Sequence, residues 1–106
     1  MENDSSKTIK ASELLNEANT VRQERGLIYG NPYYNMETTA KMVSAYINTY
    51  ITPDQMAVIL ALVKIARLAQ TSGFENKDSY VDGISYLAIA GECSTYQEYL
   101  NDDDYS

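Results

Sequence analysis

The chain contains one segment, residues 56–69, in which twelve of fourteen residues are apolar and the two exceptions are Lys64 and Arg67. These two cations are three residues apart and therefore share one face of a helix. A helix that is apolar on nearly all sides is typical of a buried central helix. An unpaired cation in a protein interior costs several kcal/mol, so we expect Lys64 and Arg67 to meet fixed anions, an anionic ligand or water.

The apolar residues of the chain follow helical spacing, and no segment alternates as a strand would. Helices are predicted at residues 12–24, 36–50, 53–71 and 78–92, the last with an alternative end at Leu100 after a break near Gly91. Thr52-Pro53-Asp54-Gln55 is a capping box with proline at the first helical position. We therefore predict an all-α fold, a compact bundle of four main helices.

The segment between the first two helices, residues 26–35, contains two glycines, a proline and two asparagines and predicts a turn. Gly26 would end the helix before it, Gly30 would adopt a positive φ, and Asn35 would cap the helix after it. The predicted organisation is a flexible polar leader at 1–10, one helical domain at 11–92 and an acidic segment at 93–106.

Composition excludes several classes of function. The 106 residues include no histidine and one cysteine, which excludes most zinc sites, histidine-activated nucleophiles and an internal disulfide, and favours a reducing cytoplasm. The net charge of −7 comes mostly from the acidic residues of 92–106, and no basic patch predicts binding to a DNA or RNA groove. The longest apolar run, 56–63, is too short to cross a membrane.

The fourth helix offers anions to the two cations. Asp78 and Asp82 are one helical turn apart, and Ser85, Ile89 and the flanking Tyr86 extend their face. Helices joined by a short connection pack antiparallel, which brings Lys64 and Arg67 within reach of this face. The four charged residues either form interhelical ion pairs, or the two aspartates hold Mg²⁺ while the two cations bind phosphate oxygens.

Three sequence blocks occur in the order Glu24-Arg25-Gly26-x-x-Tyr29-Gly30-Asn31-Pro32-x-x-Asn35, Lys64-Ile65-Ala66-Arg67-Leu68 and Lys77-Asp78-Ser79-Tyr80-Val81-Asp82. Over residues 12–92 the chain resembles a family of small uncharacterised proteins of tailed bacteriophages. The resemblance implies expression in the cytoplasm of a bacterial host.

That family is in turn similar to the all-α nucleoside triphosphate pyrophosphatases of the MazG and phosphoribosyl-ATP pyrophosphohydrolase kind. The similarity implies Mg²⁺ held by acidic pairs on two helices. Asp78 and Asp82 correspond roughly to the later pair, at a spacing of four residues in place of three. Lys64 and Arg67 stand where the earlier acidic pair is expected, so the ligands come from elsewhere or the chemistry has been lost.

The hypothesis that follows is binding, and in one version hydrolysis, of a phosphorylated nucleotide. Tyr29 would stack on the base, and Asn31 and Asn35 would contact the base or sugar, although these three residues also suit a plain connector. In the hydrolytic version, a Mg²⁺-dependent nucleoside triphosphate pyrophosphohydrolase, Asp82 and the candidate general base Glu24 would be catalytic.

Two non-catalytic alternatives remain: a protein that binds and modulates a host protein, and a sponge that sequesters a nucleotide. Glu24 and Arg25 then form a pair at the end of a helix, where Arg25 interacts with the negative end of the dipole. Four short helices enclose a modest core, so we also predict a homo-oligomer, a homodimer first of all.

Overall fold

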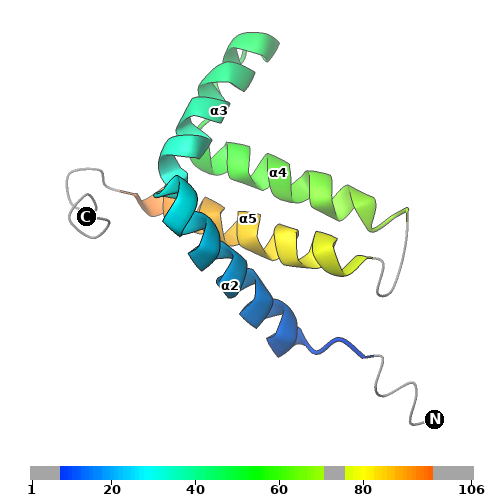
Figure 1. The fold of residues 1–106 in the computed structure, drawn as a ribbon. Helices are drawn as coiled ribbons and strands as arrows, with labels where there is room; N and C mark the ends of the chain where they lie inside the picture. Colours follow the sequence, from blue (N-terminus) through cyan, green and yellow to red (C-terminus); the bar gives the residue numbers. More distant parts are fainter. Residues whose placement is uncertain (1–7, 71–75, 97–106) are drawn as a thin grey trace.

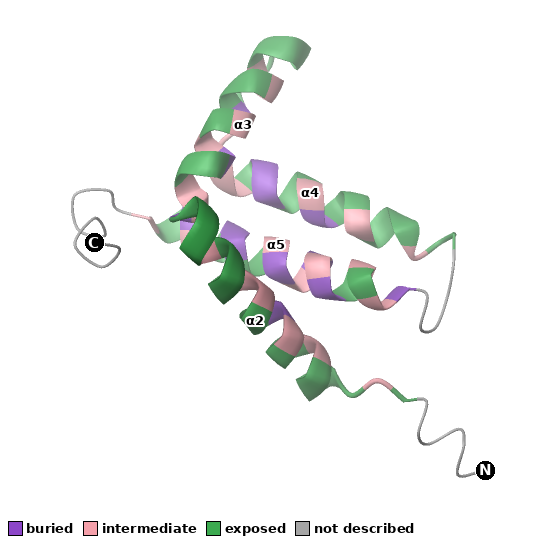
Figure 2. Ribbon diagram, viewed as in Figure 1, coloured by how far each residue is buried: buried purple, intermediate pink, exposed green. Residues whose placement is uncertain are grey.

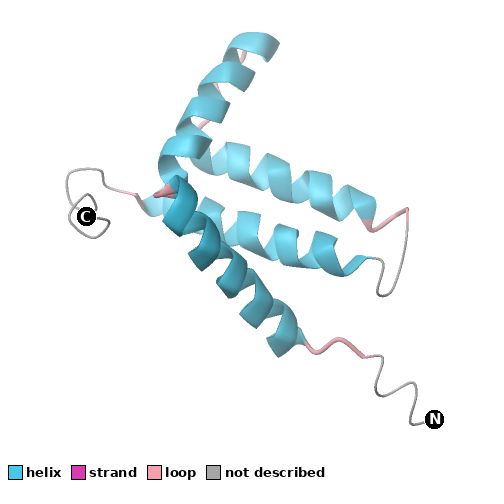
Figure 3. Cartoon of the chain, in the orientation of Figure 1, coloured by secondary structure: helices cyan, strands magenta, loops and turns pink. Residues whose placement is uncertain are grey.

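Two antiparallel helices, α4 and α5, form the centre of the molecule in a computed structural model that describes residues 8–70 and 76–96 (Figure 1). The four helices are α2 (Ala11–Tyr29), α3 (Pro32–Ile47), α4 (Pro53–Arg67) and α5 (Lys77–Thr95). Within the described ranges every regular element is a helix, which confirms the all-α prediction (Figure 3). Residues 1–7 of the leader predicted at 1–10 and the acidic residues 97–106 lie outside the described residues. The third helix, α4, ends at Arg67, before its predicted end at residue 71, because residues 68–70 form a turn.

The other two helices pack on this pair in different ways. Helix α2 crosses α5, and a salt bridge of 2.9 Å between Glu17 Oε1 and Lys77 Nζ joins them. Helix α3 meets α4 and α5 through its first half and then projects away from the pair (Figure 1). None of the helices that the structure describes has the length and apolarity needed to cross a bilayer.

Helix α4 begins at Pro53, as the sequence predicts. Thr52 Oγ1 accepts a hydrogen bond from the Gln55 N–H at 3.3 Å, and Gln55 Oε1 accepts one from the Thr52 N–H at 3.0 Å. Pro53 occupies the first helical position, where its missing N–H leaves no intrahelical bond unmade. The capping box is confirmed.

The boundary between α2 and α3 differs from the prediction. Helix α2 continues through Gly26 to Tyr29 and ends at Gly30, whose φ of 78° lies in the region that favours glycine and whose N–H donates to the Gly26 carbonyl. Asn31, not Asn35, caps α3, because its Oδ1 accepts a hydrogen bond of 2.9 Å from the Tyr33 N–H. The expected ten-residue turn is therefore a junction of two residues.

Helix α3 also ends earlier than predicted, at Ile47 in place of Tyr50. Asn48 takes a left-handed conformation with φ of 56°, which asparagine tolerates better than most residues. The following loop is held to α3 by Ser44, whose Oγ accepts a hydrogen bond of 2.8 Å from the Ile51 N–H.

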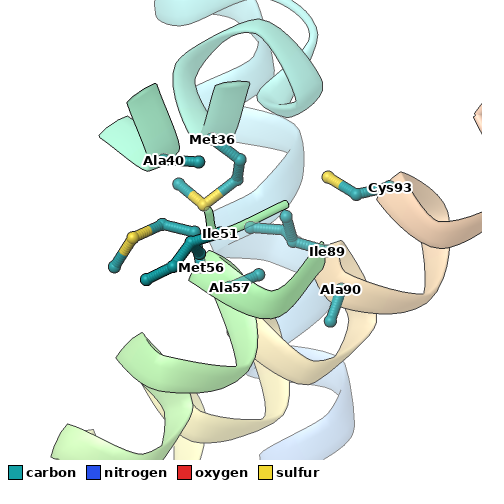
Figure 4. Close-up of a cluster of buried hydrophobic side chains, with 8 residues drawn as sticks. All are labelled: Met36, Ala40, Ile51, Met56, Ala57, Ile89, Ala90 and Cys93. Carbon is teal, nitrogen blue, oxygen red and sulfur yellow. The ribbon is translucent and has the colours of Figure 1, made fainter. Parts of the chain in front are cut away.

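The core is small and rich in alanine. One cluster joins α3, the α3–α4 loop, α4 and α5 (Figure 4), and consists of Met36, Ala40, Ile51, Met56, Ala57, Ile89, Ala90 and Cys93. Among the described residues, no large side chain is fully buried. Many apolar side chains of the described residues therefore lie outside this core.

The prediction that 56–69 forms a helix buried on nearly all sides is wrong for the single chain. Only Met56, Ala57 and Ala61 are buried in α4, and the face opposite α5 is open (Figure 2). The exposed large side chains of α4 are Val58, Ile59, Leu62, Val63 and Ile65. Helix α4 packs mainly on α5 and α3, so the apolar composition of the segment overestimated its burial.

The C-terminal helix continues past the expected domain limit at residue 92. Helix α5 runs through Gly91 without a break to Thr95, and Cys93 belongs to the core. Tyr96 then stacks on Tyr33 with ring centroids 4.2 Å apart, and its hydroxyl lies 3.0 Å from that of Tyr34. These contacts fix the end of α5 to the start of α3.

Candidate anion-binding groove

Two hollows share a wall where α2 crosses α5. The junction hollow, of about 250 Å³, is lined by Arg22, Arg25, Tyr29, Gly30, Asn31, Pro32, Asn35, Met36, Leu60, Tyr86 and Ile89. The ion-pair hollow, of about 120 Å³, is lined by Val21, Arg22, Arg25, Lys64, Asp82, Ser85, Tyr86 and Ile89. The two share the side chains of Arg22, Arg25, Tyr86 and Ile89, and we call them together the basic groove. Their combined size reaches the lower end of the range for ligand pockets, about 300–1,000 Å³.

The charge of the groove is opposite to that of the chain. Its lining contains three cations, Arg22, Arg25 and Lys64, and one carboxylate, Asp82. The arginines lie three residues apart on α2, so both reach the same side of the helix. No salt bridge joins either arginine to a carboxylate in the part of the chain that the structure describes.

The single carboxylate is already paired. Lys64 Nζ lies 3.0 Å from Asp82 Oδ2, and their side chains are only 19% and 34% exposed. This ion pair joins α4 to α5 and satisfies the requirement that a cation on the apolar helix meets an anion. Since Asp82 neutralises Lys64, the remaining positive charge of the groove comes from Arg22 and Arg25.

Two residues that line the groove, Asn31 and Ser85, each have a buried polar atom with no hydrogen-bond partner in the described structure. Asn31 uses its Oδ1 to cap α3, which leaves its Nδ2 buried and unpaired. Ser85 Oγ, one helical turn from Asp82, is also buried and unpaired. Buried polar groups are nearly always satisfied by protein or by ordered water, so this amide and this hydroxyl each have room for one more polar partner.

The structure gathers five of the eight predicted site residues in this groove. Tyr29, Asn31 and Asn35 line the junction hollow, and Lys64 and Asp82 line the ion-pair hollow. The turn motif and the helix-borne charges were separate candidates in the sequence. They form one site because α2 brings its C-terminal end onto α5.

The other three predicted residues lie outside it. Glu24, Arg67 and Asp78 are exposed and line neither hollow. No salt bridge joins Arg67 to Asp78 or to any other described carboxylate, so only Lys64 finds the expected partner. Arg67 lies at the last position of α4, where its side chain is free to reach water.

Two residues of the groove, Arg22 and Arg25, were not among the predicted site residues. Arg25 was assigned to a pair at the end of a helix, but α2 continues to Tyr29 and carries no basic residue in its last turn. The spacing of Arg22, Arg25 and Tyr29, three and four residues apart, was the available signal. This spacing places Arg22, Arg25 and Tyr29 on one helical face, because α2 extends past Gly26 to Tyr29.

The carboxylates do not form a protein-only metal cage. Searching the described residues finds no group of three or more His, Cys, Asp or Glu side chains able to hold a metal ion. Mg²⁺ needs only one or two carboxylates when phosphate oxygens and waters complete its shell. Asp82 is the one carboxylate of the groove that fits such a role, and Mg²⁺ binding remains a prediction.

The sequence matches the domain of unknown function DUF6378 over residues 13–94. No curated protein and no solved structure matches the chain. The matched range contains all four described helices except the first two residues of α2 and the last residue of α5, and it contains every residue of the basic groove. The chain therefore belongs to the DUF6378 family.

Proposed function

We propose that the basic groove binds a phosphorylated nucleotide. The observation that supports this best is the presence of Arg22, Arg25 and Lys64 around a hollow with one carboxylate, in a chain whose net charge is −7. A concave, positively charged site concentrates anions even when the rest of the surface repels them. Arginine suits phosphate in particular, because its planar guanidinium donates two parallel hydrogen bonds to phosphate oxygens.

The junction hollow supplies the features that a nucleoside needs. Tyr29 and Tyr86 provide aromatic faces on which a base can stack, a contact of about 1–3 kcal/mol in nucleic-acid-binding proteins. The unpaired Nδ2 of Asn31 offers a donor for a base carbonyl or a ribose oxygen. In this arrangement the phosphate lies at Arg22 and Arg25, which line both hollows, and the base lies at Tyr29 in the junction hollow.

Binding is supported better than hydrolysis. Asp82 faces Lys64 in the groove, whereas the second candidate ligand, Asp78, and the candidate base, Glu24, line neither hollow. A sequestering or carrier role therefore needs only residues that already line the groove. Mg²⁺-dependent hydrolysis stays open as a second activity because Asp82 is present, and the change Asp82→Asn should abolish any metal-dependent turnover.

The relation to MazG-like enzymes, the phage origin and the location in a host cytoplasm belong to the same proposal. They are supported by the three sequence blocks, of which the first and second each contribute groove residues, Tyr29 and Lys64 among them. The third block contributes Asp82. Binding to a host protein is the alternative in which the groove has no small ligand.

Isothermal titration calorimetry with nucleoside mono-, di- and triphosphates, with and without Mg²⁺, tests the proposed site. Arg25→Gln and Arg22→Gln should each weaken binding about tenfold to a hundredfold, since a hydrogen bond to a charged group contributes about 1.5–3 kcal/mol. Arg67→Gln is the matched control, because it removes the same charge from an exposed position outside the groove.

Retained affinity in Arg67→Gln together with loss in Arg25→Gln would support the groove. Equal weakening in all three variants would indicate a general charge effect and overturn it. No heat and no thermal stabilisation with any nucleotide would reject nucleotide binding, because a ligand that binds only the folded state must raise the melting temperature.

A further inference from the structure

A second surface, on α3 and α4, has no role in the basic groove. The second half of α3 projects from the molecule (Figure 1), and its last three residues, 45–47, are exposed, whereas Val43 is partly buried against the core (Figure 2). An apolar hollow of about 460 Å³ lies where the end of α3 meets the start of α4, with Ile47, Tyr50, Val58 and Ile59 in its wall. We call this surface the α3–α4 apolar face, and it consists of Tyr46, Ile47, Tyr50, Val58, Ile59 and Leu62.

All six side chains are exposed in the single chain, Ile59 the least at 36%. Tyr46 is 90% exposed and Leu62 is 54% exposed. Over the described residues, sixteen large hydrophobic side chains are exposed, while the buried hydrophobic set contains five alanines and no fully buried large side chain. Four of the six line one hollow, and Tyr46 and Leu62 are exposed on the same two helices, α3 and α4. Large exposed apolar patches mark interaction sites in stable proteins.

The charge along this part of the chain indicates what covers it. Between Met42 and Val63 the only charged residue is Asp54, although the whole chain carries a net charge of −7. Two acidic copies repel each other least where they meet through an uncharged surface. A basic partner would instead require carboxylates around the face, and the sequence places only Asp54 there.

The area of the face is sufficient for a dimer. A stable interface buries about 800 Å² on each partner. Aromatic side chains bury about 150–250 Å² each, so Tyr46 and Tyr50 contribute roughly 300–500 Å². The four aliphatic side chains and the polar residues beside them supply the remainder.

We infer that the chain forms a symmetric homodimer through the α3–α4 apolar face. The projecting half of α3 in each copy lies against α4 of the other, so that the same surface is buried twice, as in other twofold dimers. The second copy completes the cover that α4 lacks in the single chain. The interface is separate from the basic groove, which lies where α2 crosses α5.

Sedimentation or light scattering of the full chain tests this dimer. The wild-type mass should be twice 11.9 kDa at micromolar concentration and above. Tyr46→Glu and Leu62→Glu each place a charge in the face and should give the mass of one chain. Tyr46 is almost fully exposed, so its substitution leaves the fold of the single chain intact, and far-UV circular dichroism verifies this.

Leu15→Glu is the matched control. Leu15 is also more than half exposed, but it lies in the first turns of α2, away from α3 (Figure 1). This variant should remain dimeric. A wild-type chain with the mass of one copy would overturn the dimer and leave a different protein as the occupant of the face. A dimer that persists in Tyr46→Glu and Leu62→Glu, or that is lost in Leu15→Glu, would also overturn it.

Discussion

Gly26 and Gly30 lie one helical turn apart and have opposite conformational requirements. Gly30 has φ of 78°, where an L side chain is strained by about 1–2 kcal/mol, whereas Gly26 lies inside α2 with no atom within 4 Å of an added Cβ. Gly30→Ala should therefore lower the free energy of unfolding by about 1–2 kcal/mol, and Gly26→Ala should raise it by about 0.5–1 kcal/mol. Urea denaturation of both variants measures the difference. A Gly30→Ala protein as stable as wild type would contradict the junction.

Cys93 is a buried thiol whose burial raises its pKa from 9.0 to about 11, with smaller contributions from Glu92 and Asp54. The thiol ionises at a lower pH in the unfolded chain than in the folded chain. Between pH 9 and 11 the folded state therefore binds more protons than the unfolded state. Stability is therefore full below pH 9 and falls as the pH rises toward 11, by on the order of 1–2 kcal/mol. Unfolding at several alkaline pH values measures this slope.

Lys77 pairs with Glu17, and its contribution to stability is also lost as the pH rises, near the upper end of the interval between pH 9 and 11. The hydrogen bond and charge of Glu17 raise its pKa above the ordinary 10.5, so its contribution also declines at high pH. Cys93→Ala isolates the thiol, since it leaves the Lys77 pair in place and should flatten the slope between pH 9 and 11. An unchanged slope would show that Cys93 is not shielded as the structure indicates.

At the scale of a helix, the cap of α4 depends on a single side chain. Thr52→Ala removes the acceptor for the Gln55 N–H and should lower the free energy of unfolding by about 1 kcal/mol. Thr20→Ala makes the same substitution at an exposed position inside α2, where alanine's higher helix propensity should stabilise by a few tenths of a kcal/mol. Urea midpoints that shift in opposite directions would support the cap, and equal shifts would argue against it.

The start of α4 was predictable because all of its determinants are neighbours in sequence. The junction of α2 and α3 was harder, since Gly26 and Gly30 both satisfy the rule for a helix end. The pair Asn31-Pro32 decides between them, as a cap followed by proline at the first helical position, the same arrangement as Thr52-Pro53. That local signal was present in the sequence but was attributed to a turn.

The groove was predictable only in part. The pairing of Lys64 with Asp82 follows from two antiparallel helices that are adjacent in sequence, and the structure confirms it. The participation of Arg22 and Arg25 depends on where α2 crosses α5, which is set by packing between distant segments. Helical periodicity places side chains on a face, but it does not specify which helix that face meets.

At the scale of the whole molecule, the apolar composition of residues 56–69 predicted more burial than one chain provides. The apolar run of α4 is covered on one side by α5, and its opposite side is open. The proposed second copy accounts for this difference, because residues that are core in the dimer are surface in the single chain. In that case the sequence pattern of α4 reflects the assembly.

The proposed dimer predicts a thermal stability that depends on protein concentration. When two folded chains dissociate as they unfold, each tenfold dilution weakens the folded state by about 1.4 kcal/mol of dimer. For a unit of twice 106 residues, 1 kcal/mol shifts the melting temperature by about 2–4 °C, so tenfold dilution should lower it by roughly 3–6 °C. Tyr46→Glu unfolds as one chain, and its melting temperature should not change with concentration. Differential scanning calorimetry of both proteins separates the two cases, and a wild-type melting temperature that is independent of concentration would mean that the exposed face of α4 has no second copy against it.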